Sequence, residues 1–174
     1  MIAPRFAIRP AHLPETPLPG ESPESLATRL AKEKALAVAG ALRPGLSRSR
    51  AVVIGSDTIV ALGSRVLGKP KDIAEARRML RLLSGRTHRV VTGVAAWSGR
   101  DGKLRAGRRV TRVVFRAITA AEIRDYVATG EPADAAGAYQ IQGGAARFVL
   151  RIEGSYSNVV GLPLDLVARL LARS

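Results

Sequence analysis

Cysteine is absent from the chain, which excludes disulfides and thiolate-bound metal centres. Histidine is scarce too, since His12 and His88 are too few for a typical histidine-rich metal cluster. Any metal would therefore be a hard cation held by oxygen atoms. The sequence also lacks an apolar run long enough to cross a bilayer and a signal-peptide pattern at Met1. We therefore expect a cytoplasmic protein without a membrane partner.

Acidic and aromatic residues are both few. The 14 acidic residues face 28 basic ones, giving a net charge of +14. Such a balance favours polyanionic partners such as nucleotide phosphates or nucleic acid, although a genome-wide composition bias explains it equally well. Phe, Tyr and Trp make up only 4% of the chain, and RNP-like and helix-turn-helix patterns are lacking. A basic nucleic-acid binder is thus an alternative, and we expect no specific nucleic-acid partner.

Several familiar catalytic patterns are missing as well. The sequence contains neither GxxxxGK[ST] nor GxGxxG, so a P-loop or a dinucleotide-binding turn does not account for phosphate affinity. A Ser/His/Asp triad has no support, because His88 stands at the start of an expected strand and is interpreted as structural. With 174 residues, 47% of them hydrophobic, the chain has material for one core, and we predict a single domain over residues 1–174.

Apolar periodicity and capping residues predict interspersed helices and strands. Helices are expected after Ser22, Asp72 and Thr119, and a last one begins near Pro163. Because helices and strands do not strictly alternate, we predict an α/β domain with a mixed β-sheet. The expected strands lie at residues 5–9, on both sides of a turn near residues 55–57, and at residues 65–67, 88–97, 110–115 and 147–152.

Asp57 interrupts an apolar run at residues 51–62. A carboxylate in a buried strand is costly unless it is paired, hydrogen-bonded or bound to a metal, so Asp57 marks a working site. Lys34 falls on the apolar stripe of the helix after Ser22. A snorkelling side chain and an ammonium group aimed at an anion in a cleft explain that position equally well.

Three other polar residues are candidates for the same site. Glu15 lies in a proline-rich loop that limits its freedom, and Lys69 precedes Pro70, which favours an extended backbone. Taken alone, each is most simply a surface residue. Gln142 is followed by Gly143 and Gly144, a pattern suited to close contact between backbone and ligand.

Six segments give the chain a specific resemblance. They are GSDTIV, GKPKD, SGRTHRVVTGVA, EIRDYVATGEP, AGAYQIQG and IEGSYSNVVGLPL, they occur in this order, and the resemblance runs from about Phe6 to Leu164. The chain resembles the Maf family of nucleoside triphosphate pyrophosphatases. This resemblance implies an elongated, helix-flanked mixed sheet with a central cleft, as in inosine triphosphatases. It also implies cleavage between the α and β phosphates with a divalent cation, usually Mg²⁺, and a possible homodimer.

The resemblance assigns roles position by position. Asp57 matches the catalytic base, which also contacts the metal, and Glu15 matches the acidic residue that helps to hold the metal. Lys34 and Lys69 match lysines that face the triphosphate, and Gln142 matches a substrate-contacting position. The segments IQG and GSYSNVVGLPL resemble the branch that acts on dTTP and UTP rather than the 7-methyl-GTP branch, which is the alternative specificity.

One part of the family pattern has no counterpart in this sequence. Relatives open with a strand and a loop reading roughly Ser-x-Ser-Pro-Arg-Arg, whereas this chain begins at the next strand, FAIRPAHLPE. We therefore expect a domain truncated at its N-terminus relative to the family, from a start assigned too late. Without those phosphate contacts we predict weak turnover, and a catalytically impaired nucleotide-binding protein is the alternative function.

Overall fold

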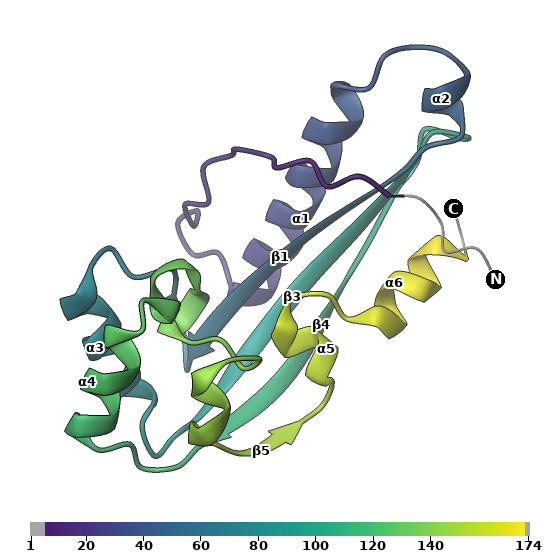
Figure 1. Ribbon diagram of the computed structural model, residues 1–174. Coiled ribbons are helices and arrows are strands. Elements are labelled where there is room, and N and C mark those ends of the chain that lie inside the picture. Colours follow the sequence, from purple (N-terminus) through teal and green to yellow (C-terminus); the bar gives the residue numbers. More distant parts are fainter. Residues whose placement is uncertain (1–5, 173–174) are drawn as a thin grey trace.

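The computed structural model describes residues 6–172 and shows a long twisted sheet with helices on both faces (Figure 1). Within those residues the sheet has five strands in the order β2-β1-β3-β4-β5. Every neighbouring pair is antiparallel. The strands are β1 (Val52–Leu62), β2 (Arg65–Leu67), β3 (Thr87–Ser98), β4 (Leu104–Phe115) and β5 (Val149–Glu153).

The α/β class is confirmed, but the described sheet is antiparallel where we expected a mixed one. The helix between β2 and β3 does connect two strands of the same direction. Both strands are antiparallel to β1, which lies between them, so they never pair with each other. The order of elements along the chain did not reveal that β1 is inserted between these two parallel strands.

Three helices begin where their capping residues predicted. Ser22 Oγ accepts a hydrogen bond from the Ser25 backbone N–H at the start of α1, and Asp72 caps α3 in the same way. Thr119 and Glu122 form the expected capping box of α4. The α-helices of the described residues are α1 (Pro23–Gly40), α2 (Leu46–Ser49), α3 (Ile73–Leu83), α4 (Ala120–Ala128), α5 (Tyr156–Val160) and α6 (Leu164–Leu171).

Several expected boundaries were wrong. Residues 6–9 form neither helix nor strand, and Arg5 lies outside the described residues. Residues 52–62 form one continuous strand rather than two strands with a turn near residues 55–57. The last strand begins at Val149, because residues 144–148 form a 3-10 turn. The helix α5, within SYSNVVG, was not predicted.

Gly55 has a packing role rather than a turn role. A Cβ atom there would lie 2.3 Å from the Ala31 carbonyl oxygen of α1, and one at Gly93 would lie 2.1 Å from the Ala27 carbonyl oxygen. These two strand glycines therefore allow the backbone of α1 to rest directly on β1 and β3. Sequence reasoning took a close-packing glycine for a turn because both require the missing side chain.

The main hydrophobic core lies at one end of the sheet, beneath α3 and α4 (Figure 1). Phe115, Tyr126 and Phe148 are among its largest fully buried side chains. A smaller cluster that includes Leu26, Leu30 and Ile59 joins α1 to the opposite face of β1. Between residues 6 and 172, no helix has the length and hydropathy needed to cross a membrane.

The edge of β1 determines where a cavity can form. The short strand β2 pairs only with Val60, Ala61 and Leu62, while β3 covers the other edge of β1 along its length. Among the described residues, no strand pairs with the outer edge of β1 from residue 52 to residue 59. Ligands and side chains can therefore reach both faces of the sheet around this edge.

Candidate active site

A cavity of about 620 Å³ surrounds the open edge of β1. Asp57 and Ile59 reach it from the face covered by α1, whereas Ser56 and Thr58 reach it from the other face. Residues 134–136 and 139–142 form the opposite wall. The cavity thus joins the sheet edge, the N-terminal loop and the segment after α4, three regions that are far apart in the sequence.

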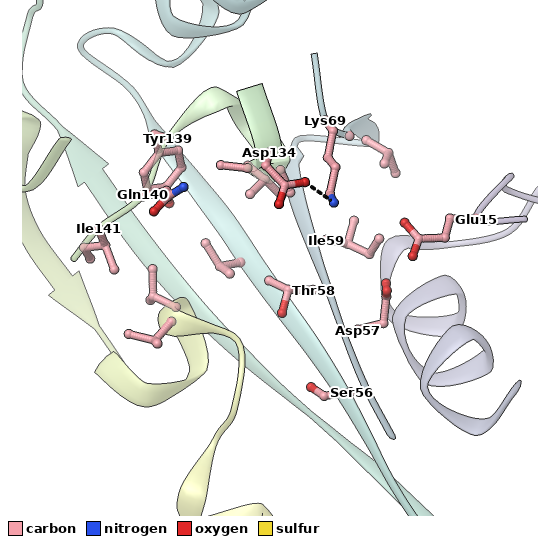
Figure 2. Close-up of a pocket in the computed structure, with 18 of the residues that line it drawn as sticks. Glu15, Ser56, Asp57, Thr58, Ile59, Lys69, Asp134, Tyr139, Gln140 and Ile141 are labelled. Atoms are coloured by element: carbon pink, nitrogen blue, oxygen red, sulfur yellow. Dashed lines mark hydrogen bonds and ion pairs between the residues drawn. The ribbon is translucent and has the colours of Figure 1, made fainter. Parts of the chain in front are cut away.

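Three of the predicted site residues meet at one end of this cavity. Lys34 Nζ donates a hydrogen bond of 2.6 Å to Asp57 Oδ1 and another of 2.6 Å to Glu15 Oε1. Figure 2 shows Glu15 and Asp57 at the same end of the pocket. Asp57 is only 7% exposed, whereas the Glu15 side chain is 49% exposed. The expectation that Asp57 is a paired carboxylate in the sheet is therefore confirmed.

The structure decides whether Lys34 is a snorkelling side chain or an ammonium group aimed into a cleft. Its side chain points into the cavity and is 21% exposed, so it is not a stem that carries its charge out to water. Two carboxylate oxygens converge on its ammonium nitrogen. The same end of the cavity can therefore stabilise either a cation or an anion bound beside Lys34.

The electrostatics of this cluster favour a carboxylate that can exchange protons. Burial raises the pKa of Asp57 above its ordinary value, and the hydrogen bond from Lys34 opposes this shift without cancelling it. Burial would lower the pKa of Lys34, but its bonds to Asp57 and Glu15 outweigh burial and raise that pKa. Lys34 therefore stays charged at neutral pH, while Asp57 becomes a stronger base than an exposed aspartate.

Lys69 also lines the cavity but does not join the Asp57 cluster. It forms an ion pair with Asp134 across the cavity wall, as the dashed line in Figure 2 shows. The side chains of Lys69 and Asp134 are 58% and 85% exposed, so the pair lies in water and contributes little to stability. Sequence reasoning missed Asp134, because nothing in its local pattern indicated a contact with a residue 65 positions away.

Gln142 lines the cavity together with Tyr139, Gln140 and Ile141. In Figure 2 the labelled members of this segment lie at the end opposite Asp57 and Glu15. Gln142 and Gln140 are exposed, whereas Tyr139 and Ile141 are buried. The cavity therefore has one end rich in charge and another that presents neutral amide and apolar groups.

His88 is structural, as expected. It is 1% exposed, and its Nε2 atom shares a 2.9 Å hydrogen bond with the Tyr139 hydroxyl. Burial lowers the pKa of His88 to about 4, so the ring is neutral near pH 7. Its edge-on contact with Phe115, with ring centroids 4.8 Å apart, places it in the main core. The hydrogen bond with His88 therefore supports Tyr139 from behind the cavity wall.

The two carboxylates were tested as ligands of a divalent cation. Within residues 6–172 no group of three or more His, Cys, Asp or Glu residues has the geometry of a metal site. Mg²⁺ needs fewer protein ligands, because one or two carboxylates and the substrate phosphates usually hold it. Glu15 and Asp57 present hard oxygen atoms that already converge on one positive charge, so the residues present fit Mg²⁺.

The chain was also compared with known proteins. A family model described as "Maf-like protein" matches residues 1–174. A "dTTP/UTP pyrophosphatase" of Geobacter sulfurreducens is 49% identical over 168 residues, which are 97% of this chain and 85% of that protein. Proteins of the same name from Pelotomaculum thermopropionicum and Myxococcus xanthus are 48% and 49% identical, over 97% and 98% of this chain and 85% and 82% of theirs.

Proposed function

Because the chain belongs to the Maf family, we propose that it hydrolyses dTTP and UTP to the nucleoside monophosphate and pyrophosphate. The names of the similar proteins support this substrate class. The observation that carries the proposal is the convergence of Asp57, Glu15 and Lys34 inside one cavity. A buried base beside a positive charge is what attack of water on a polyphosphate requires.

In the proposed reaction, water attacks the α-phosphorus and the bond to the bridging oxygen of the β-phosphate breaks. Asp57 accepts the proton of the attacking water, and its raised pKa brings it closer to neutral pH, where a general base is most effective. The negative charge leaves with pyrophosphate. Lys34 holds Asp57 in place and neutralises negative charge on the phosphates.

Glu15 and Asp57 are the residues that would hold Mg²⁺. A bound Mg²⁺ would supply neutralisation of the phosphate charge, and Glu15 is exposed enough to contact both the cation and solvent. Lys69 reaches the same cavity from beyond β2, and its exposed pairing with Asp134 costs little to exchange for a phosphate contact. Gln142 contacts the nucleoside at the neutral end of the cavity.

The reaction is tested by measuring pyrophosphate release with Mg²⁺ from dTTP, UTP, GTP and 7-methyl-GTP. Wild-type protein is compared with Asp57→Asn and with Asp101→Asn, a change at a surface turn outside the cavity. We expect Asp57→Asn to lower kcat by roughly 10² to 10⁴-fold and Asp101→Asn to leave it unchanged. Equal loss in both variants, or no loss in either, would contradict the role of Asp57.

The same experiment separates the alternative functions. Nucleotide binding without any wild-type turnover would indicate the impaired nucleotide-binding protein. Preferred cleavage of 7-methyl-GTP would indicate the other branch of the family. Salt-dependent binding of duplex DNA without hydrolysis would indicate the basic nucleic-acid binder. We place the reaction in the cytoplasm, where nucleoside triphosphates are made and used. We also propose that the protein is a homodimer, and sedimentation of the active protein tests this.

A further inference from the structure

The wall at the neutral end of the cavity has little regular structure of its own. Residues 139–143 form neither helix nor strand, yet they carry the exposed side chains of Gln140 and Gln142. Such a segment is mobile in most proteins unless other groups hold its backbone. What holds this segment therefore determines how accurately its amide side chains face a bound nucleotide.

Glu131 bridges the two ends of this segment. Its Oε1 atom accepts a 2.8 Å hydrogen bond from the Tyr126 hydroxyl, and that hydroxyl accepts a 3.1 Å bond from the Gln140 backbone N–H. Its Oε2 atom accepts a 3.0 Å bond from the Gly144 backbone N–H. One carboxylate thus connects the start of the segment, through Tyr126, with its end. We call residues 126, 131, 140 and 144 the Glu131 clasp.

Two more contacts tie the same segment to Glu131. The Gln140 side-chain Nε2 atom donates a 3.1 Å hydrogen bond to the Glu131 backbone carbonyl. A Cβ atom added at Gly143 would lie 2.3 Å from Glu131 Oε1. The carboxylate is held by its two donors, so it cannot move aside without losing them. Gly143 therefore allows the segment to pass directly over the Glu131 side chain.

Tyr126 is suited to be the centre of this arrangement. It is completely buried, and its ring packs edge-on against Phe148 with ring centroids 5.4 Å apart. Burial raises the pKa of Tyr126 well above its ordinary value, so the hydroxyl stays protonated and can donate to Glu131. The hydroxyl is therefore a fixed point in the core, and the clasp ties the cavity wall to it.

We propose that Glu131 is a positioning residue for nucleotide selection. This inference rests on the proposed pyrophosphatase function and extends it to the residue that orders the wall at the neutral end. Glu131 does not line the cavity, so it acts through the segment that carries Gln140 and Gln142. Asp57 and Lys34, at the other end, are held by their own contacts and do not depend on the clasp.

A stabilising role alone must be separated from a positioning role, and Glu122 offers the matched control. Its carboxylate accepts hydrogen bonds from the Thr119 backbone N–H and from the Arg116 guanidinium. It lies close to Glu131 in the sequence, but its hydrogen bonds go to Arg116 and Thr119 rather than to residues 139–144, and it does not line the cavity. Losing the Glu122 contacts should lower stability without changing nucleotide selection.

The test compares Glu131→Gln, Tyr126→Phe and Glu122→Gln. A glutamine at position 131 replaces one of the two acceptor oxygens by an NH₂ group, so Tyr126 and Gly144 no longer each donate to an oxygen of their own. We expect the first two variants to raise KM for dTTP and UTP about tenfold and to reduce their preference over GTP by a similar factor. Their kcat should stay within about threefold of wild type, because the Asp57 end is unchanged. Glu122→Gln should keep the wild-type KM and preference.

A second readout is independent of turnover. Amide hydrogen exchange at Gln140 and Gly144 should become faster in Glu131→Gln, while exchange in β3 stays unchanged. If wild-type protein does not hydrolyse nucleotides, equilibrium binding of dTTP and GTP to the same variants replaces KM. In that case the proposed function fails while the role of Glu131 is still decided. Unchanged selection in Glu131→Gln, or an equal change in Glu122→Gln, would overturn the proposal.

Discussion

The contact between Lys34 and Asp57 makes a quantitative prediction about the pH dependence of activity. Replacing Lys34 with methionine keeps an unbranched side chain of similar length and removes its charge. Two unit charges about 4 Å apart attract by about 4 kcal/mol at an effective dielectric constant of about 20. The cavity is open to water and the Lys34 side chain is 21% exposed, so roughly half or less of this attraction acts on Asp57.

A loss of about 1 to 2 kcal/mol, which is a quarter to half of that attraction, corresponds to a rise of about 0.7 to 1.5 units in the pKa of Asp57. The sign follows from the charges, since burial already favours the neutral acid and Lys34 is the group that favours the carboxylate. Repulsion by the Glu15 carboxylate remains in the variant and acts in the same direction. Activity that requires ionised Asp57 should therefore begin to fall at a higher pH in Lys34→Met than in wild type.

The assay is the pH profile of kcat/KM for pyrophosphate release, whose acid limb reports the base of the free enzyme. The control is Lys32→Met, an exposed position two residues earlier on α1. We expect the limb to move upward by about 0.7 to 1.5 units in Lys34→Met and to stay within about 0.3 units in Lys32→Met. An acid limb that stays in place or moves down in Lys34→Met would refute the electrostatic reasoning, even if the rate falls.

Three further predictions concern other parts of the molecule. In the folded protein His88 has a pKa of about 4 and is neutral near pH 7, so the free energy of unfolding should fall by up to about 3 kcal/mol as the pH drops from about 6.5 to 4. Chemical denaturation of His88→Leu should show a smaller decrease over the same pH range, and an identical decrease would contradict this prediction. Gly55→Ala should lower the free energy of unfolding by about 2 kcal/mol or more, because its Cβ atom would overlap α1. Gly40→Ala has open space around it and should not be destabilised. Equal melting temperatures of the two variants would refute this prediction. Lys69→Met should raise KM for dTTP but change unfolding free energy by less than about 1 kcal/mol, because its pair with Asp134 is exposed; an unchanged KM would remove Lys69 from the substrate site.

The local features of the sequence were sufficient to locate the charged end of the site. A carboxylate in an apolar strand and a lysine on the buried stripe of a helix are both costly, so each indicated a partner before any contact was known. The structure confirms that Asp57 and Lys34 are partners of each other. Glu15 was selected through the family resemblance, because a glutamate in a proline-rich loop is by itself an ordinary surface residue. Its contact with Lys34 requires the loop to fold back over α1.

The sequence also determined the starts of α1, α3 and α4, the α/β class and the family, because caps, apolar periodicity and ordered motifs act over a few residues at a time. Only the tertiary structure decided the antiparallel pairing, the open edge of β1, the ion pair of Lys69 with Asp134 and the Glu131 clasp. These features depend on which distant segments become neighbours. That choice is made by packing over the whole sheet, and no short stretch of sequence contains it.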